Sequence, residues 1–230
     1  MPRWLFAAGI AAILAALADP SRQAAAGTIP CREMYGSGGG YVCGADVESR
    51  IMDPAFVPAQ TQAGAWATSM AMLIAFNGGG VSQADILSAI FGATLPDSLP
   101  PAQAQTYLNH SYTASADHSV SNTTGTALFT TPQNGSRSAL RTLVGQLQNE
   151  TPLLVFTSHN AMILTTIYYH ADLFSRPVSL YAAVVRDPYP VQGTAPPLGV
   201  KLDNRPGERF LSAAEFNDIQ YVDQMTVASH

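Results

Sequence analysis

The hydrophobic pattern of the chain changes its period near Pro152, and this change limits the possible folds more than any other feature. Before Pro152, apolar residues recur at the three-to-four-residue spacing of helices. Capping residues support these helices, since Ser82 and Ser136 precede two of them and Asn77 opens the glycine run that ends another. The predicted helices cover residues 65–76, 83–91 and 137–148.

After Pro152 the pattern becomes that of buried strands, which are short and continuously apolar. The predicted strands cover residues 152–157, 161–169, 180–185 and 221–227. Residues 27–58 are rich in Gly and Pro and have no apolar period, so we expect irregular structure there. Residues 109–136 predict a loop with one strand near 127–130. Helices come first and strands later, which predicts an α+β fold with segregated layers.

Length and composition allow a sizeable core and exclude one class of partner. The chain has 230 residues, of which 47% are hydrophobic and 12% charged, and this suits one domain or one domain of two lobes. Its net charge is -5, Lys201 is its only lysine, and no run of Lys or Arg occurs. We therefore expect no surface that follows phosphates and no nucleic-acid partner. We also expect no cofactor.

The first residues resemble an export signal. Arg3 gives a short basic start, and residues 4–18 form an apolar run that is too short to span a bilayer comfortably. Small residues at Ala16 and Ala18 fit a cleavage site, which predicts a signal peptide at 1–18, with residues 24–26 as an alternative site. An uncleaved anchor or a buried helix are the other interpretations. We expect a secreted or periplasmic protein with no stable membrane span.

The two cysteines, Cys31 and Cys43, form an even pair in a chain that we expect to be exported. Such a pair predicts one disulfide, because oxidising compartments preserve disulfides. The alternative is that one of them is a reactive thiol. We expect no metal site at these cysteines, because no His or further Cys lies near them in the sequence.

Residues 57–73 carry the most informative motif, in which a Val-Pro and two glutamines precede Ala65, Trp66 and an Ala- and Met-rich helix. This segment resembles the nucleophile segment of papain-like cysteine proteases. In bacterial members of that family, a Val-Pro and a Gln precede Cys-Trp-Ala, and a helix begins at the Cys. Ala65 stands at the position of that Cys.

Three further segments follow in the order of that family. Residues 82–87 resemble its second helix, residues 151–164 its strand, turn and catalytic-His strand, and residues 185–190 the strand that ends in Asp-Pro. The resemblance implies a papain-like fold, in which an N-terminal helical lobe packs on a C-terminal antiparallel β-sheet lobe. The implied boundaries are 1–18 for the signal peptide, 19–55 for an N-terminal segment with the cysteine loop, and 56–230 for the papain-like domain.

The resemblance also implies roles for individual residues. Ala65 takes the nucleophile position, and His159 that of the general acid and base. Asp187 takes the position of the acid that orients the His. Gln60 is the candidate for stabilising the oxyanion, with Gln62 as the alternative, because Gln60 lies one residue closer to position 65 than is usual. Purely structural roles stay open for His159 in its strand and for Asp187 in a turn.

The functional prediction follows from the alanine. A papain-type site needs a thiolate at a helix N-terminus, and Ala65 has no lone pair, so the mechanism cannot run on this chain. Ala65 is natural, or replaces a catalytic Cys, or is wrongly aligned with it. The predicted function is a secreted papain-like scaffold that is inactive as a peptidase. The alternatives are a natural pseudo-protease that binds a peptide or protein in its cleft, and an interaction domain without a cleft function.

Overall fold

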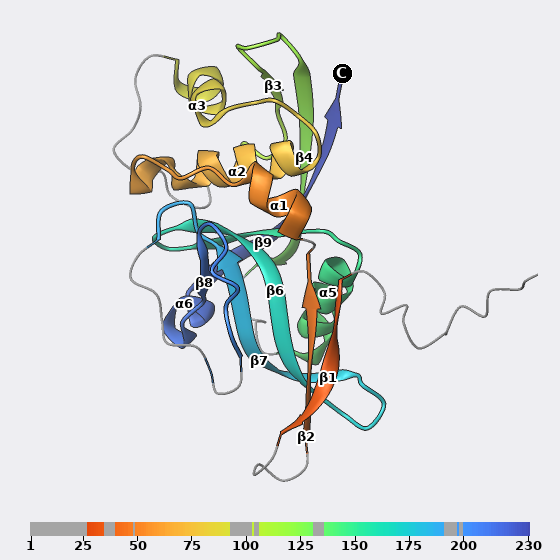
Figure 1. Ribbon diagram of the computed structural model, residues 1–230. Helices are drawn as coiled ribbons and strands as arrows, with labels where there is room; N and C mark the ends of the chain where they lie inside the picture. Colours follow the sequence, from red (N-terminus) through yellow and green to blue (C-terminus); the bar gives the residue numbers. More distant parts are fainter. Residues whose placement is uncertain are drawn as a thin grey trace, which may run out of the picture.

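The computed structural model describes most of the chain from Gly27 onward (Figure 1). The described residues are 27–34, 40–47, 49–92, 106–130, 136–190 and 200–230, with residues 103 and 197. The predicted signal peptide at 1–18 and the alternative cleavage site at 24–26 lie outside them. No helix within the described residues is both long and apolar enough to cross a membrane.

Helices and strands occupy different parts of the molecule, which confirms the predicted α+β class (Figure 1). Helices α1, α2 and α3 lie together at one end, most of the sheet lies at the other, and α5 runs along the sheet. The bounds are Ser49–Ala55 for α1, Ala65–Phe76 for α2, Gln83–Phe91 for α3, Arg137–Gln148 for α5 and Ala213–Asn217 for α6, with the 3-10 turn η1 at Gln62–Gly64.

The strands form one antiparallel sheet in the order β1-β2-β6-β5-β9-β4-β3, with β7 and β8 joined to it through β6. Strand β6 organises the sheet, because Ile163 pairs with Leu154 of β5 on one edge and with Arg186 of β7 on the other. The bounds are Thr28–Met34 for β1, Gly40–Asp46 for β2, Ser111–Thr113 for β3, Val120–Thr130 for β4, Leu153–Thr157 for β5, Ala161–Ala171 for β6, Pro177–Arg186 for β7, Glu208–Phe210 for β8 and Ile219–Ser229 for β9.

The three predicted helices and the four predicted strands after Pro152 are confirmed, with small differences at the strand ends. Capping explains why the starts of α3 and α5 could be predicted. The Ser82 hydroxyl accepts a hydrogen bond from the backbone N–H of Asp85, and the Asp85 carboxylate accepts one from the N–H of Ser82. Ser136 caps α5 in the same way, by accepting from the N–H of Ala139.

The expectation of irregular structure at 27–58 is wrong, because β1, β2 and α1 lie there. Strand β2 pairs with the second half of β6, as in the pair Val42 and His170, and its Cys43 and Ala45 are buried in a core cluster with α5. The loop expected at 109–136 is also partly wrong, because β3 and β4 occupy much of it. Four of the 11 residues of β4 are threonines, which fit strands because their β-branched side chains suit a pleated surface.

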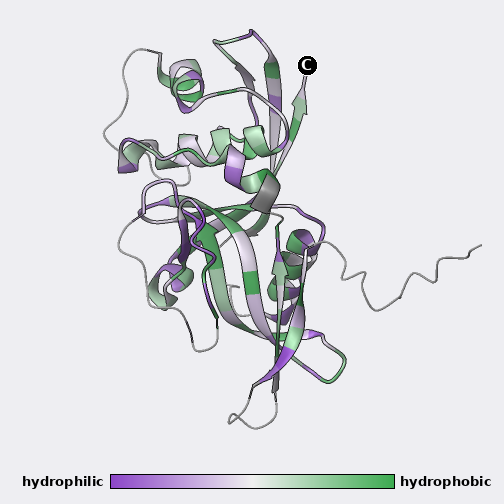
Figure 2. Ribbon diagram, in the orientation of Figure 1, coloured by the Kyte–Doolittle hydropathy of each residue, from purple (hydrophilic) through white to green (hydrophobic). Residues whose placement is uncertain are grey.

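The core lies on both faces of the sheet, which explains the continuous apolar runs of β5 and β6. In β5, Leu154 and Phe156 pack with α2, whereas Leu153 and Val155 pack with α5. Successive side chains of a strand point to opposite faces, so a strand covered on both faces is mostly apolar and does not alternate. Hydrophobic residues accordingly run along α2 and the central strands (Figure 2).

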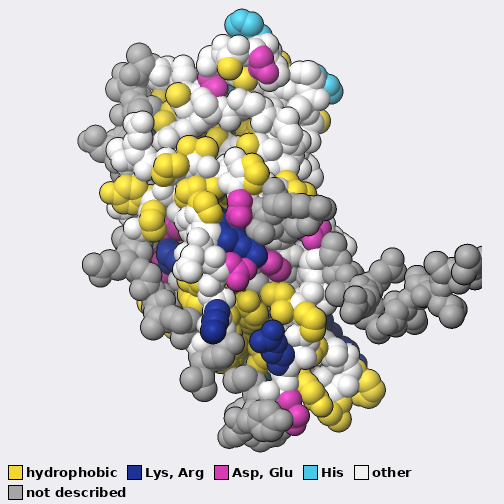
Figure 3. All heavy atoms as spheres, viewed as in Figure 1, with side chains coloured by type: hydrophobic (Ala, Val, Ile, Leu, Met, Phe, Trp, Pro, Cys, Tyr) yellow, Lys and Arg dark blue, Asp and Glu magenta, His cyan; other side chains and the backbone are white. Residues whose placement is uncertain are grey.

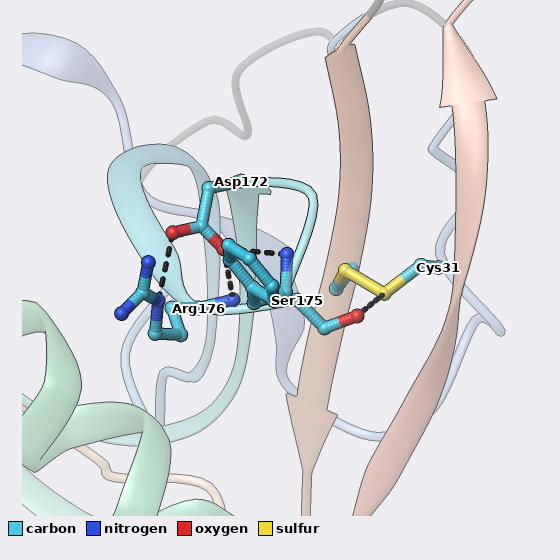
Figure 4. Close-up of a disulfide and its surroundings, with 6 residues drawn as sticks. Cys31, Asp172, Ser175 and Arg176 are labelled. Atoms are coloured by element: carbon cyan, nitrogen blue, oxygen red, sulfur yellow. Dashed lines mark hydrogen bonds and ion pairs between the residues drawn. A yellow bond between two sulfur atoms is a disulfide. The ribbon is translucent and has the colours of Figure 1, made fainter.

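The predicted disulfide between Cys31 and Cys43 is confirmed, and it joins β1 to β2. The loop between β6 and β7 lies beside it, where the hydroxyl of Ser175 is 3.8 Å from the sulfur of Cys31 (Figure 4). Since β2 also pairs with β6, the disulfide connects the outermost strand β1 to the centre of the sheet.

Replacing both cysteines, Cys31→Ser with Cys43→Ser, should lower the free energy of unfolding. The disulfide closes a loop with a sequence separation of 12, for which the chain-entropy model gives about 3 kcal/mol. Urea unfolding of the oxidised protein and the double variant measures the difference. Ser175→Ala is the matched control and should change stability by less than about 0.5 kcal/mol. A double variant as stable as the parent would contradict the prediction.

Candidate functional site

The start of α2 is held in place by contacts that leave Ala65 completely buried. The side chain of Thr61 accepts a hydrogen bond from the N–H of Gly64, and the hydroxyl of Thr68 donates to the carbonyl of Gly64 at 3.1 Å. The amide of Gln83 on α3 donates to the same carbonyl at 3.3 Å. A Cβ at position 64 would lie 2.2 Å from the Gln83 amide nitrogen, so a larger residue there would displace the Gln83 side chain from its bond to this carbonyl.

The structure brings the start of α2 next to the turn that carries His159. The side-chain amide of Gln62 donates to the backbone carbonyl of His159 at 2.9 Å, and the hydroxyl of Ser69 donates to the carbonyl of Ala161 at 2.9 Å. Ala65 and Ser69 are four residues apart in one helix and share a face. Ala65 therefore lies on the face of α2 that packs against the β5–β6 turn.

Asp187 is also part of this site, but its carboxylate does not hold the ring of His159. One oxygen accepts hydrogen bonds from the side chain of Asn160 and the N–H of Tyr189, both at 2.9 Å. The other accepts from Arg209 at 2.7 Å. Complete burial raises the pKa of Asp187, although the charge and hydrogen bond of Arg209 oppose this rise. Asp187 thus anchors the residue that follows His159.

Arg209 of β8 links Asp187 to a second carboxylate. Its two terminal nitrogens donate to the two oxygens of Glu215, at 2.6 and 3.0 Å, which is the bidentate geometry that favours Arg over Lys. Glu215 also accepts from the N–H of Ser212 and so forms the capping box of α6. Partial burial alone would raise the pKa of Glu215, but hydrogen bonds from Arg209 and Ser212 hold it below its ordinary value.

Asp218, at the end of α6, holds the His159 turn from the other side. One of its oxygens accepts from both the hydroxyl and the N–H of Ser158, at 2.5 and 2.9 Å. The hydrogen bond from the Ser158 hydroxyl lowers the pKa of Asp218, and the charge of His159 adds to this effect. Inside the turn, the Thr157 hydroxyl accepts from the N–H groups of His159 and Asn160. The backbone of the turn is therefore well supported, while His159 is exposed.

Gln60 lines a cavity beside the start of α2. The backbone N–H of Ala59 donates to the carbonyl of Pro188 at 2.8 Å, which draws this segment to the end of β7. The cavity has a volume of about 380 Å³ and lies between α2 and α3. It is lined by Gln60, Thr61, Ala63, Gly64, Trp66, Gln83, Ala84, Leu87, Ser88 and Gly92. Gln62, the alternative to Gln60, does not line it and instead bonds to the His159 carbonyl.

The described residues show neither a cluster of metal ligands nor a group of unpaired basic side chains at the site. Among the described residues, no three His, Cys, Asp or Glu side chains come together as metal ligands would. Basic side chains on the face in Figure 3 lie singly or beside acidic ones. Arg205, for example, pairs with Asp46 at 3.7 Å and with Asp203 at 2.6 Å. The cavity itself is lined by neutral residues.

Three residues of the site were missed in the sequence: Asn160, Arg209 and Asp218. Asn160 lies within the family-like segment but is more often a turn residue, and only its bond to Asp187 reveals its contribution. Arg209 and Asp218 lie 22 and 60 residues from the groups they bind, Asp187 and Ser158, and neither belongs to a motif. No local pattern indicates such contacts.

The lowered pKa of Asp218 predicts a pH-dependent contribution to stability. A carboxyl whose pKa is lower in the folded state stabilises above its unfolded pKa, and this contribution disappears as the pH falls through the folded value. Asp218→Asn should therefore lower the unfolding free energy at pH 7, with a smaller loss near pH 3. Thermal unfolding across this pH range measures both values. Ser158→Ala should show the same trend, and a loss that is independent of pH would contradict the assignment.

Comparison with known proteins identifies no relative of this chain. No family model matches the chain, and it has no match among curated proteins or solved structures. The functional interpretation therefore depends on the contacts themselves. These are the convergence of the α2 start, the β5–β6 turn and the end of β7, and the neutral cavity beside them.

Proposed function

We propose that the protein is an exported papain-like scaffold that lacks peptidase activity and binds a peptide segment beside the start of α2. This proposal combines two hypotheses from the sequence, an inactive papain-like scaffold and a pseudo-protease that binds a peptide or protein in its cleft. A neutral cavity of about 380 Å³ suits one or two side chains of an extended peptide. Gln60 and the side-chain oxygen of Gln83, whose nitrogen already donates to Gly64, provide polar groups in its lining that can pair with a peptide backbone.

One observation carries the proposal: the Gln62 amide bonds to the carbonyl of His159 at the point where α2 begins with Ala65. A papain-type site needs an imidazole beside a helix N-terminus. The two segments that would supply these groups come from positions about 95 residues apart in the chain and still meet. This contact supports the resemblance to papain-like proteases, since local structure does not bring residues so distant in the sequence together.

The partners of Asp187 favour binding over latent hydrolysis. A working triad needs an acid that accepts a hydrogen bond from the imidazole, so that the ring keeps its tautomer and orientation. Both oxygens of Asp187 are instead occupied by Asn160, Tyr189 and Arg209. Restoring a thiol at position 65 would therefore not by itself restore a triad.

The first test introduces the missing thiol by Ala65→Cys. Position 65 is completely buried, and burial raises the pKa of a thiol, so we expect slow alkylation by iodoacetamide at pH 7 and no cleavage of a peptide library. The native cysteines are paired, so the variant has one free thiol. Ala63→Cys is the matched control, since it places a thiol on the half-buried cavity wall and should react faster.

The opposite result would identify a latent peptidase. If the Ala65→Cys protein reacts much faster than the Ala63→Cys protein and cleaves peptides, the binding-only proposal is wrong. Loss of this activity in Ala65→Cys with His159→Ala would then confirm the papain mechanism.

The second test addresses peptide binding directly in the parent protein. Peptides selected from a random display library should bind to the folded chain, and Ala84→Trp should weaken binding at least about tenfold by filling the cavity. Ala89→Trp on the same helix is the matched control, because Ala89 is exposed and does not line the cavity. Fluorescence anisotropy with labelled peptides measures both. Equal affinity in the two variants would contradict the proposed site.

A further inference from the structure

The loop between β6 and β7 exposes two large hydrophobic side chains at its tip. Leu173 is 85% exposed and Phe174 is 77% exposed, more than the other exposed large hydrophobic residues of the described chain. Figure 1 shows this loop beside the β1–β2 hairpin, at the end of the molecule opposite α2 and α3. The tip therefore lies apart from the cavity.

The tip is held rigidly by one carboxylate. Asp172 accepts hydrogen bonds from the backbone N–H groups of Phe174 and Arg176, at 2.9 and 3.0 Å, and pairs with the Arg176 side chain at 2.8 Å (Figure 4). The carbonyl of Asp172 accepts from the N–H of Ser175 at 2.9 Å. These bonds fix the backbone of the turn that carries Leu173 and Phe174.

Polar and aromatic groups surround the base of the tip. The guanidinium of Arg176 lies 5.0 Å from the centre of the Phe174 ring. Tyr41 of β2, which is 38% exposed, pairs with Ala171 just before the tip. The loop thus has apolar side chains at its apex, with a tyrosine and an arginine behind them. Residues that bind a lipid bilayer follow the same order, from the hydrocarbon to the headgroups.

We propose that this tip, Leu173 and Phe174, inserts into the surface of a lipid bilayer and docks the protein peripherally. A stable protein interface needs about 800 Å² on each partner, which two side chains on a convex loop do not supply. A bilayer accepts a convex apolar tip without a matching surface. The proposal is independent of peptide binding.

The charges near the tip predict which lipids it needs. Arg176 is paired with Asp172, and the neighbouring strand β1 contributes one basic and one acidic residue, Arg32 and Glu33. These four residues have no net charge, and binding should depend on hydrophobic insertion rather than on anionic headgroups. We expect binding to phosphatidylcholine vesicles, with little change on adding salt or phosphatidylserine.

Vesicle flotation of the parent protein and of Leu173→Ser with Phe174→Ser tests the proposal. The double variant should lose at least about tenfold in its partition to phosphatidylcholine vesicles, while its thermal unfolding stays unchanged because both side chains are exposed. The matched control is Ile51→Ser with Val57→Ser, which removes two other exposed hydrophobic residues and should leave partition unchanged. Phe174→Trp should show blue-shifted emission with vesicles and quenching by brominated lipid.

Two results would overturn the proposal. The first is a parent protein that does not float with phosphatidylcholine vesicles, which would assign the tip to a protein contact instead. The second is equal loss of partition in the tip variant and the Ile51 and Val57 control, which would mean that general surface hydrophobicity, rather than this loop, carries the association.

Discussion

The packing of α2 against the first residues of β6 is the interaction on which the rest of the structure depends. Ser69 donates to the carbonyl of Ala161 from within the helix, and Gln62 donates to the carbonyl of His159 just before it. The first ten residues of α2 are buried, so the helix is held on all sides. Shifting α2 would break these bonds and separate Ala65 from the β5–β6 turn. The candidate site exists because this one helix end is placed so firmly.

The elements that could be predicted are those whose own residues explain them. Helices α3 and α5 have serine caps and apolar spacing, α2 is apolar on all sides, and β5 and the first four residues of β6 are continuously apolar because both faces of the sheet are covered. Strands β1 and β2 could not be predicted, since their conformation depends on the pairing of β1 with β2 and of β2 with β6, and their composition resembles a loop. In the site, the order of the motifs predicted that Ala65 and His159 would lie on adjoining segments. The partners of Asp187 could not be predicted, because Arg209 comes from a distant strand without a motif.

The hydrogen bonds and the ion pair of Asp187 are the reason that we infer binding rather than hydrolysis at this site. A buried carboxylate needs partners that compensate for lost hydration, and Asp187 finds them in Arg209, Asn160 and the N–H of Tyr189. Arg209 is in turn balanced by Glu215. These contacts hold the backbone next to His159 without engaging its ring. Such an arrangement fixes the backbone of the β5–β6 turn and occupies both oxygens of Asp187, which agrees with the proposed binding function better than with hydrolysis.

The most direct test of this account is to locate a bound peptide by NMR. Amide chemical shifts of the isotopically labelled protein, recorded during titration with a selected peptide, would map the contact residue by residue. The account predicts the largest changes at residues 60–66 and 83–88, with smaller ones in the turn at 158–160, and contacts between the peptide and the Trp66 ring. Shift changes confined to the sheet or to the far end of the molecule, with none at the start of α2, would contradict it.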